Sequence, residues 1–562
     1  MLLGGYEAFR CPVRVWWDHL PGAALDSEAS SSLQRRFDGG NVFEEQIFAE
    51  LSALHGPEAV LVGGDSTGER VEATLDAMRS GRRLVLGGQL PHDRAGGRVG
   101  KPDILLRVTA DDEPPRYVPV DVKHYRQFGK TLARAARKGV PRYSTLADPH
   151  ALVEVPRISG SSDHRFKACM QLTHYTRMLQ ACGFHPGPNW LTGAVIGTSD
   201  ITDVVPGAGR WVLGWFDLNE PLFTTYSRDL EGPKVRSALD RYDHEFAFRL
   251  EVARKAAESL DDTARPVEPI RQEDCGDCPY SSRCLVESEG RAHRDITHGA
   301  LSVREWKALG RLGIVTTADL AAVDLDRSDL VERLVPEVEK NEEQMEKRLG
   351  DAIRRARLIV AGQPWERVAP ADEMPAADIE IDVDMENQQQ GGLVYMWGIR
   401  KRLGQDDTTA EYVDDFHTWA ELDVDRAGHL AERYFRWLQA QIADAEAAGK
   451  TIAFFHWTSP EVGKLRRHLP GTITEEEFSA VEKHHVDLWD HFRKRYFSVH
   501  GTGLKNVARS LGFEWPMQDA GGEHSLGVIE QAQRGDETAR QWLRDYNHAD
   551  TAATAHIRDA LR

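Results

Sequence analysis

Two short apolar runs joined by an acidic turn constrain the fold of this chain more than any other feature. The runs cover residues 104–108 and 117–122, and the turn between them holds two prolines. Apolar, β-rich runs on both sides of such a turn predict a β-hairpin. If the hairpin is symmetric, the numbers of paired residues add up to 224, and Asp103 lies opposite Asp121.

This hairpin would bring two carboxylates and an ammonium group together. Side chains alternate along a strand, so Asp121 and Lys123 share one face while Val120 and Val122 share the other. Carboxylates this close repel each other, and a hard divalent cation such as Mg²⁺ relieves the repulsion. A lysine beside the ion can orient a water molecule and stabilise charge on a phosphate. The alternative is an ordinary amphipathic hairpin with exposed charges.

Length and composition indicate the class of protein. With 562 residues the chain is too long for one hydrophobic core, so we expect two or three domains. Its 41% hydrophobic and 28% charged residues are typical of a soluble globular protein. No apolar run approaches the roughly 18 residues that cross a bilayer, and the N-terminus lacks a signal-peptide pattern. We therefore expect a cytoplasmic protein without a membrane partner.

The net charge of −19 argues against a protein that coats nucleic acids, because it would repel phosphates. A local basic groove is compatible with that charge. Residues 123–142 contain cations and no acid, next to the hairpin site where a polyanionic substrate would need them. A solvated helix face is the alternative. The cations are Lys123, Arg126, Lys130, Arg134, Arg137, Lys138 and Arg142.

A group of three closely spaced cysteines indicates a metal site. Cys275, Cys278 and Cys284 are too close for ordinary core residues, and a disulfide framework is not expected in the cytoplasm. Zinc usually joins two cysteine pairs, whereas this chain has one pair and a single later thiol. A [4Fe-4S] cluster completed by Cys11 is the better fit, with Zn²⁺ as the alternative. Two further cysteines are expected to be buried and inert, Cys169 and Cys182.

Two predicted helices add polar candidates. A helix that opens at Gly40 carries an apolar stripe, with Glu44 at its edge as a metal ligand or as solvated surface. On a later helix Gln171 and Tyr175 share a face, where an amide and a phenol could bind a phosphate or a base. The stripe consists of Phe43, Ile47, Leu51 and Leu54.

These motifs together resemble the RecB-like nucleases of the PD-(D/E)XK superfamily over about residues 1–290. The cysteines are similar to those of the iron-staple subgroup, which includes AddB-type repair nucleases and CRISPR-adaptation nucleases. Many relatives carry histidine where this chain has Glu44, and Glu45 is a rival for its role. The motifs are Glu44, Gly100-x-x-Asp103, Asp121-x-Lys123, Gln171-x3-Tyr175 and the set Cys11, Cys275, Cys278 and Cys284.

The resemblance implies a role for each of these residues. Asp103, Asp121 and Glu44 would bind Mg²⁺ or Mn²⁺, and Val122 would be a further metal-binding position. Lys123 would position the attacking water. The helical pair would contact DNA, namely Gln171 and Tyr175.

The middle of the chain is expected to be a helical connector followed by a linker. Residues 295–345 have a polar, helical pattern, and residues 354–375 combine prolines, alanines and mixed charges. The segment 309–320 resembles a helix-hairpin-helix, whose glycine turn offers backbone N–H groups to a phosphate. A plain helical connector is the alternative.

The last third contains a second set of carboxylates. Residues 378–386 alternate strictly between apolar and acidic, which predicts a strand with one core face, and residues 391–399 predict the next strand. Four like charges on the other face destabilise a strand unless something cationic lies there. The four are Glu380, Asp382, Asp384 and Glu386.

Two later segments add candidates to this set. Residues 452–457 predict a buried strand, and Glu461 falls in the first turn of the helix that follows near Pro460. Glu461 could also be only a partner of the helix dipole. Tyr546 and Asp550 lie one turn apart on the last predicted helix.

This third resembles the ribonuclease H-like DEDD exonucleases, and Tyr546-x3-Asp550 is similar to their DEDDy branch. The resemblance implies two metal ions about 3.5 to 4 Å apart, with Tyr546 orienting the attacking water. Asp384 and Glu386 would supply the first acidic motif. Glu461 would supply the second motif, and Asp550 the last acid.

The second motif departs from that family. Relatives usually carry Asn and Asp where this chain has Trp457 and Glu461, and Asp487 could replace or assist Glu461.

The whole layout resembles a family of bacterial two-part putative nucleases. We expect an α/β protein with a restriction-endonuclease-like PD-(D/E)XK domain at 1–292, a connector at 293–371 and a ribonuclease H-like domain at 372–562. Such a protein would be a metal-dependent nuclease that hydrolyses DNA phosphodiester bonds, acting as an exonuclease on single-stranded ends in repair, recombination or defence.

Two alternatives stay open. One is a catalytically silent nucleic-acid-binding adaptor within a larger complex, and the other is a ribonuclease that acts through the C-terminal domain. The sequence has no phosphate-binding loop of an ATPase motor. A helicase, or another repair or defence protein, would therefore be a separate partner.

Overall fold

The computed structural model describes most of the chain as two compact units. Unit 1 comprises Met1–Glu289, Val303–Ala308 and Asp329–Met345, and unit 2 comprises Gly290–Ser302, Leu309–Ser328 and Glu346–Arg562. Every helix in the described part is too short or too polar to cross a membrane. The described residues are 1–25, 31–129, 132, 140–155, 157–159, 164–225, 234–338, 341–370, 374–388, 392–458, 460–469, 471, 473–517 and 522–562.

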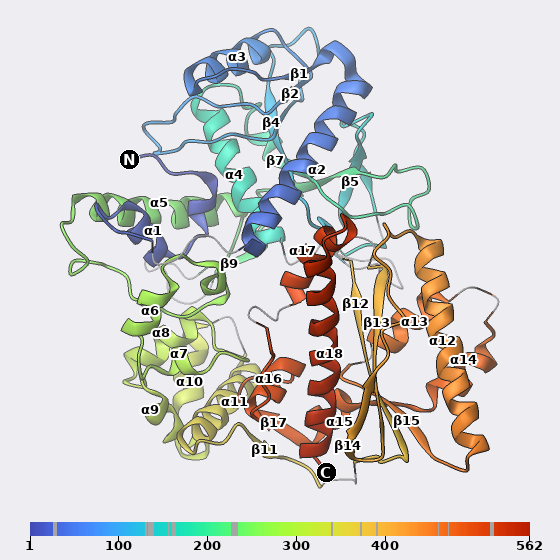
Figure 1. Ribbon diagram of the computed structural model, residues 1–562. Helices are drawn as coiled ribbons and strands as arrows, with labels where there is room; N and C mark the ends of the chain where they lie inside the picture. Colours follow the sequence, from blue (N-terminus) through green and yellow to red (C-terminus); the bar gives the residue numbers. More distant parts are fainter. Residues whose placement is uncertain are drawn as a thin grey trace. The chain divides into compact units, whose positions relative to one another are not determined.

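The described part of unit 1 is built around an eight-stranded mixed sheet in the order β1-β2-β3-β4-β7-β8-β5-β6 (Figure 1). β1 is parallel to β2 and β4 is parallel to β7, while the other neighbours are antiparallel. The strands are β1 (Ala59–Leu61), β2 (Leu84–Leu86), β3 (Ile104–Arg107), β4 (Tyr117–Val122), β5 (Arg142–Thr145), β6 (Val153–Glu154), β7 (Thr192–Ile196) and β8 (Val212–Asp217).

The predicted hairpin is present as β3 and β4, in the predicted register. Ile104 pairs with Val120, and the numbers of all paired residues add up to 224. Val120 and Val122 belong to the core cluster that includes one face of helix α2 (Ser31–His55). Asp121 therefore points to the opposite face, where helix α4 (Arg165–Ala181) packs on β4.

Helix α2 differs from its prediction in where it begins and in how much of its apolar stripe is buried. It begins at Ser31 rather than at Gly40, although a glycine costs a helix about 1 kcal/mol and this helix contains two. Of the predicted apolar stripe, Phe43, Ile47 and Leu51 are buried, but Leu54 is 49% exposed. The sequence pattern identifies the apolar face of a helix, but it does not show how much of that face the rest of the protein covers.

The other elements of unit 1 surround this sheet and the cysteines. Helices α1 and α5 pack against each other, with Trp16, Tyr242 and Phe246 buried in one cluster. These elements are η1 (Gly5–Ala8), α1 (Pro12–His19), η2 (Gly56–Glu58), α3 (Thr67–Arg79), η3 (Pro188–Trp190), β9 (Phe223–Thr225), β10 (Lys234–Arg236), α5 (Ala238–Glu258), η4 (Glu273–Asp277), α6 (Ser281–Glu287), α10 (Leu330–Leu334) and η6 (Val335–Glu337).

The described part of unit 2 contains a five-stranded sheet in the order β14-β13-β12-β15-β16. β12, β13 and β14 form the predicted antiparallel meander, and β15 and β16 run parallel to β12. The predicted second strand starts at Val394, and Gly391 lies outside the described residues. The strands are β12 (Ile379–Asn387), β13 (Val394–Leu403), β14 (Asp406–Tyr412), β15 (Ile452–His456) and β16 (His485–Asp487).

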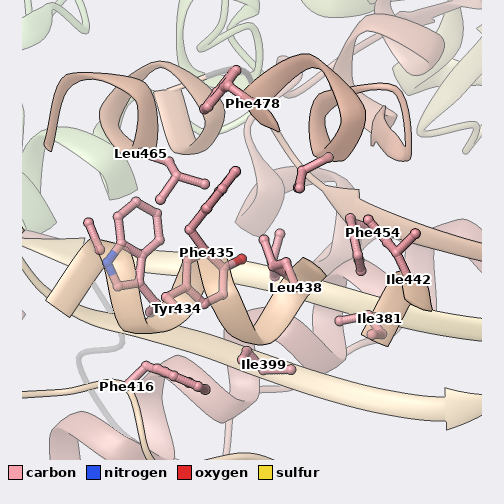
Figure 2. Close-up of a cluster of buried hydrophobic side chains, with 14 of the residues drawn as sticks. Ile381, Ile399, Phe416, Tyr434, Phe435, Leu438, Ile442, Phe454, Leu465 and Phe478 are labelled. Carbon is pink, nitrogen blue, oxygen red and sulfur yellow. The ribbon is translucent and has the colours of Figure 1, made fainter. Parts of the chain in front are cut away.

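The apolar face of this sheet is covered by helix α12 (Val424–Ala447). Figure 2 shows Ile381 and Ile399 of the sheet close to Leu438 of this helix. On its far side the helix packs against α13 (Pro460–His468) and α14 (Glu475–Glu482), which contribute Leu465 and Phe478 to the same core. Alternation on β12 therefore directs its acidic residues to the other face.

That other face is covered by helix α18 (Glu537–Ala560), which contacts β12 and β13. Figure 1 shows α18 in red and α12 in orange on the two sides of these strands. The other elements of unit 2 after β16 are α15 (Leu488–Arg495), β17 (Tyr496–Ser498), α16 (Leu504–Ser510) and α17 (Gly522–Gln533).

The predicted connector contains several helices, and part of the predicted linker at residues 354–375 has regular structure. Helix α11 (Glu342–Val360) continues into that segment, and β11 (Trp365–Arg367) pairs with β17. Trp365 packs edge-on against Phe492 and Tyr496, a contact over more than a hundred residues that local composition does not reveal. The remaining helices here are α7 (Ala292–Asp295), α8 (Val303–Arg311), α9 (Thr317–Ala321) and η5 (Leu325–Arg327).

Candidate metal sites

Three carboxylates from two elements meet in unit 2. Asp384 and Glu386 lie on the α18 face of β12, and Asp550 lies on α18 itself. One oxygen of each is within 4.8 Å of the other two, and among the described residues this is the one such group of three or more metal-ligand side chains. Oxygens this close suit a shared divalent ion, which would draw them to about 2.1 Å from itself if it were Mg²⁺.

The acidic row on β12 divides into a paired half and this carboxylate trio. Arg402 donates to Glu380 at 2.7 and 3.1 Å, and Arg558 lies 3.0 Å from Glu380 and also pairs with Asp382. The sequence predicts that the row of like charges on β12 needs nearby cations. These cations are arginines, and they lie at one end of the row. Asp384 instead accepts a hydrogen bond of 2.8 Å from the amide of Asn547.

The trio is destabilised as long as no cation binds it. Burial, and then Asp550 and Glu386, raise the pKa of Asp384 well above its ordinary value. Burial, and then Asp550, raise the pKa of Glu386 to about 8, although Ser525 donates to its carboxylate at 3.2 Å. Such a cluster favours a divalent ion, since the ion offsets both the burial and the mutual repulsion. Bound there, Mg²⁺ or Mn²⁺ would polarise a phosphate and activate water.

Tyr546 and a lysine complete this site. Tyr546 donates a hydrogen bond to Asp550, as its position one turn earlier on α18 predicts. Lys505 on α16 donates to the Tyr546 hydroxyl at 2.6 Å, and its ammonium lies 3.9 Å from Asp550. Trp515 donates its indole N–H to Asp550 at 2.6 Å.

Sequence reasoning missed four residues of this site, Lys505, Ser525, Trp515 and Asn547. Each is a single residue of a common polar or aromatic type without a repeating pattern. Asn547 follows Tyr546 directly and could have been found only from the helical position it shares with Asp550. The others reach the site from α16, α17 and a loop, which only the tertiary fold brings together.

Glu461 lies near the trio but is not part of it. Its side chain, in the first turn of α13, accepts long hydrogen bonds of 3.4 and 3.5 Å from Thr458 and lies 3.9 Å from His456. Burial raises its pKa to about 7, with Asp487 adding to the shift. Asp487 caps α15 by accepting the Asp490 N–H at 2.9 Å.

In unit 1 the hairpin brings Asp103, Asp121 and Lys123 together as predicted. The ammonium group lies 3.3 Å from Asp103 and 3.1 Å from Asp121, and the Val122 backbone N–H donates to Asp103 at 2.7 Å. Burial raises the pKa of Asp121 to about 8, although the Lys123 ammonium lies beside it. A fully buried carboxylate next to a second carboxylate fits a metal ligand, because a divalent ion offsets both the burial and the repulsion.

Glu44 faces this site, whereas Glu45 does not. Glu44 is half-buried, and burial followed by the charge of Asp103 raises its pKa. Glu45 is exposed on the neighbouring position of α2. The structure therefore places Glu44, rather than its rival, within electrostatic reach of the hairpin carboxylates.

Gln171 and Tyr175 share one face of α4, as predicted, and both are buried. The Gln171 amide donates to the Tyr175 hydroxyl at 3.1 Å, which donates in turn to the Lys101 carbonyl at 3.1 Å. Gly100 fits here because a Cβ atom would lie 2.8 Å from the Tyr175 ring. The pair thus holds the segment that leads into Asp103.

The four cysteines of the predicted cluster gather in unit 1. Cys11 directly precedes α1, and its thiol is within electrostatic reach of the other three thiols. No three thiols of the described residues lie within 4.8 Å of one another. Tetrahedral zinc would place its sulfurs about 3.8 Å apart, and no three of the described thiols are that close. The other members are Cys275, Cys278 and Cys284.

The remaining predictions concern the other cysteines and the basic segment. Cys169 is buried and Cys182 partly buried, and burial raises the pKa of both thiols, that of Cys169 to about 12. Both are therefore poor nucleophiles. Of the basic segment, Arg126 is exposed and Lys123 is paired at the hairpin site. Four of its cations lie outside the described residues, Lys130, Arg134, Arg137 and Lys138.

An acidic trio on the central strand of a mixed sheet and on the helix that crosses it is typical of metal-dependent nucleases. Residues 383–562 match the model of a family described as the RNase_H superfamily, and this match spans the whole trio. The C-terminal part of the chain is therefore an RNase H-like domain, with the nuclease-like function and nucleic-acid binding that this implies. No curated protein and no solved structure matches the chain significantly.

Proposed function

We propose that this protein is a metal-dependent nuclease that hydrolyses DNA phosphodiester bonds, acting as an exonuclease on single-stranded ends in repair, recombination or defence. The observation that carries the proposal is the meeting of Asp384, Glu386 and Asp550 on one face of an RNase H-like sheet. These carboxylates would hold Mg²⁺ or Mn²⁺, and Tyr546 would orient the attacking water.

The hairpin of unit 1 is proposed as a second nuclease site of the RecB-like PD-(D/E)XK type. Asp103, Asp121 and Glu44 would bind the metal, and Lys123 would position the water. The full burial of Asp121 beside Asp103 and Lys123 supports this assignment. Gln171 and Tyr175 would act by fixing the Lys101 segment, since both are buried and bonded to each other.

The four gathered cysteines are proposed to hold a structural [4Fe-4S] cluster. The cysteine pattern supports this cluster over Zn²⁺, because zinc usually joins two cysteine pairs and this chain has only one pair among the four. Because Cys11 and Cys284 lie at the two ends of the first half of the chain, such a cluster would close that half into one folded unit.

The test is the digestion of end-labelled single- and double-stranded DNA with Mg²⁺ or Mn²⁺, by wild type, Asp121→Ala, Asp384→Ala and the double variant. We expect each single variant to lose one cleavage activity and the double variant to lose all cleavage. Asp112→Ala in the exposed hairpin turn and Asp425→Ala on the exposed start of α12 are matched controls. Full activity of the double variant would reject the proposal, and binding without cleavage by wild type would favour an adaptor.

A second candidate, ribonuclease action by the C-terminal domain, is favoured by the family match, which covers that domain alone. The same variants assayed on labelled RNA decide between the two. Loss of RNA cleavage in Asp384→Ala, with DNA cleavage unchanged, would assign the C-terminal site to RNA.

A further inference from the structure

The Lys505 ammonium lies beside the carboxylate trio and is fixed there by three contacts. It donates to the Tyr546 hydroxyl at 2.6 Å, lies 4.3 Å from the centre of the Tyr546 ring, and is 3.9 Å from Asp550. A second aromatic ring, that of Trp515, lies 5.7 Å away. The cation is therefore held at the site rather than in solvent, with 23% of its side chain exposed.

Among the side chains that the structure describes, few acids besides the trio lie near this site. A two-metal site holds ions about 3.5 to 4 Å apart and needs acids that reach both of them. The trio suits one ion, and the further described acid within electrostatic reach of Asp384 is Glu461, which is in turn influenced by Asp487. Glu461 is engaged by Thr458 and is not in the trio, while Asp487 caps a helix.

The balance of charges at the site also indicates a single metal ion. Three ionised carboxylates carry three negative charges, which one divalent ion and one ammonium group neutralise. A second divalent ion would add two positive charges within a few ångströms of Lys505, where like charges repel strongly in a partly buried site. The lysine therefore disfavours a second ion at the position that it occupies.

We propose that the C-terminal site binds a single divalent ion, and that the Lys505 ammonium supplies beside Asp550 and Tyr546 the positive charge of the missing second ion. This inference rests on the proposed nuclease function. In that function Lys505 would stabilise the charge that develops on the phosphate, and its hydrogen bond would hold the Tyr546 hydroxyl toward the attacking water. This arrangement departs from the two ions that the DEDD resemblance implies.

The test counts Mn²⁺ ions bound to the full chain by equilibrium dialysis. Every sample carries Asp121→Ala, which removes the proposed metal site of the hairpin. The number of ions at the C-terminal site is the difference between the counts for chains with and without Asp384→Asn. We expect a difference of one ion per chain. In Lys505→Ala we expect either a second ion or at least tenfold tighter binding of the first, together with slower cleavage.

Further variants serve as controls for the effect of Lys505→Ala on Mn²⁺ binding. Lys505→Met retains the packing of the aliphatic chain, and Lys505→Arg retains the charge and should still bind one ion. Lys483→Ala removes an exposed lysine of the same unit and should change nothing. A difference of two ions with Lys505 in place, or unchanged Mn²⁺ binding in both Lys505→Ala and Lys505→Met, overturns the inference. Because ion counting does not depend on cleavage, a protein that binds one ion but cuts nothing refutes only the proposed function.

Discussion

Arg558 on α18 and Asp382 on β12 form a fully buried ion pair two residues along the strand from Asp384. Asn547 and Asp550 lie about three and two turns before Arg558 on the same helix. The pair therefore fixes the register in which α18 lies on β12. That register places Asn547 and Asp550 against Asp384.

Arg558→Met should destabilise the protein and weaken its metal site. Removing one partner of a buried pair typically costs about 3 to 5 kcal/mol, because Asp382 and Glu380 keep their charges inside the fold. Urea unfolding measures this loss, and Mn²⁺ titration measures the weaker site. Asp382→Leu combined with Arg558→Met should recover much of the stability, and a double variant as unstable as the single one would contradict this account. Arg534→Met, on an exposed helix end, is the control.

Gly398→Ala should disturb the same site from the neighbouring strand. A Cβ atom at Gly398 would lie 1.5 Å from the Asn547 amide oxygen, so Asn547 must move and release Asp384. Overpacking of this kind costs about 1 to 3 kcal/mol. We expect a lower melting temperature and weaker Mn²⁺ binding.

A second glycine of the same unit provides the control for Gly398→Ala. Gly463→Ala has open space in helix α13 and should stabilise the helix by about 0.5 to 1 kcal/mol. Equal effects of both substitutions would mean that crowding of Asn547 is not the cause.

Local patterns predicted the parts of the fold that depend on neighbouring residues. Alternation on two strands and a symmetric turn were enough to give the register of the β3–β4 hairpin and the acidic face of β12. The sequence could not show that Arg402 and Arg558 compensate Glu380 and Asp382 while leaving Asp384 for a metal. Arg402 and Glu380 are neighbours on adjacent strands, but Arg558 pairs with Asp382 across more than 150 residues, and local patterns do not reveal that pairing.

The stability of the metal-free protein should fall as the pH rises. The pKa of Glu386 is raised to about 8 in the folded state, above its value of about 4.3 in an unfolded chain. Its contribution to stability is therefore complete below about pH 4 and is lost as the pH rises through about 8. We expect the melting temperature in EDTA to drop between pH 5 and 8 and Mn²⁺ to restore it, most strongly at pH 8.

Glu386→Gln isolates this effect from other titrating groups. The variant cannot ionise, so the difference in melting temperature between it and wild type should change with pH in EDTA. If the difference in melting temperature is constant from pH 5 to 8, the pKa of the Glu386 carboxyl is not raised in the way that the structure indicates.

Cys278→Ser should remove the proposed cluster and destabilise unit 1. Protein prepared anaerobically should show the broad visible absorbance of an iron–sulfur centre, and the variant should lose it together with bound iron. Cys182→Ser is the matched control, because that thiol lies outside the gathered four and should leave colour and iron unchanged. A colourless wild type that contains zinc would instead mean that the thiols draw closer around a tetrahedral ion. In that case a zinc ion would join Cys11 to Cys284. Cys278→Ser would then lower the stability of unit 1 and remove bound zinc, with no change in absorbance.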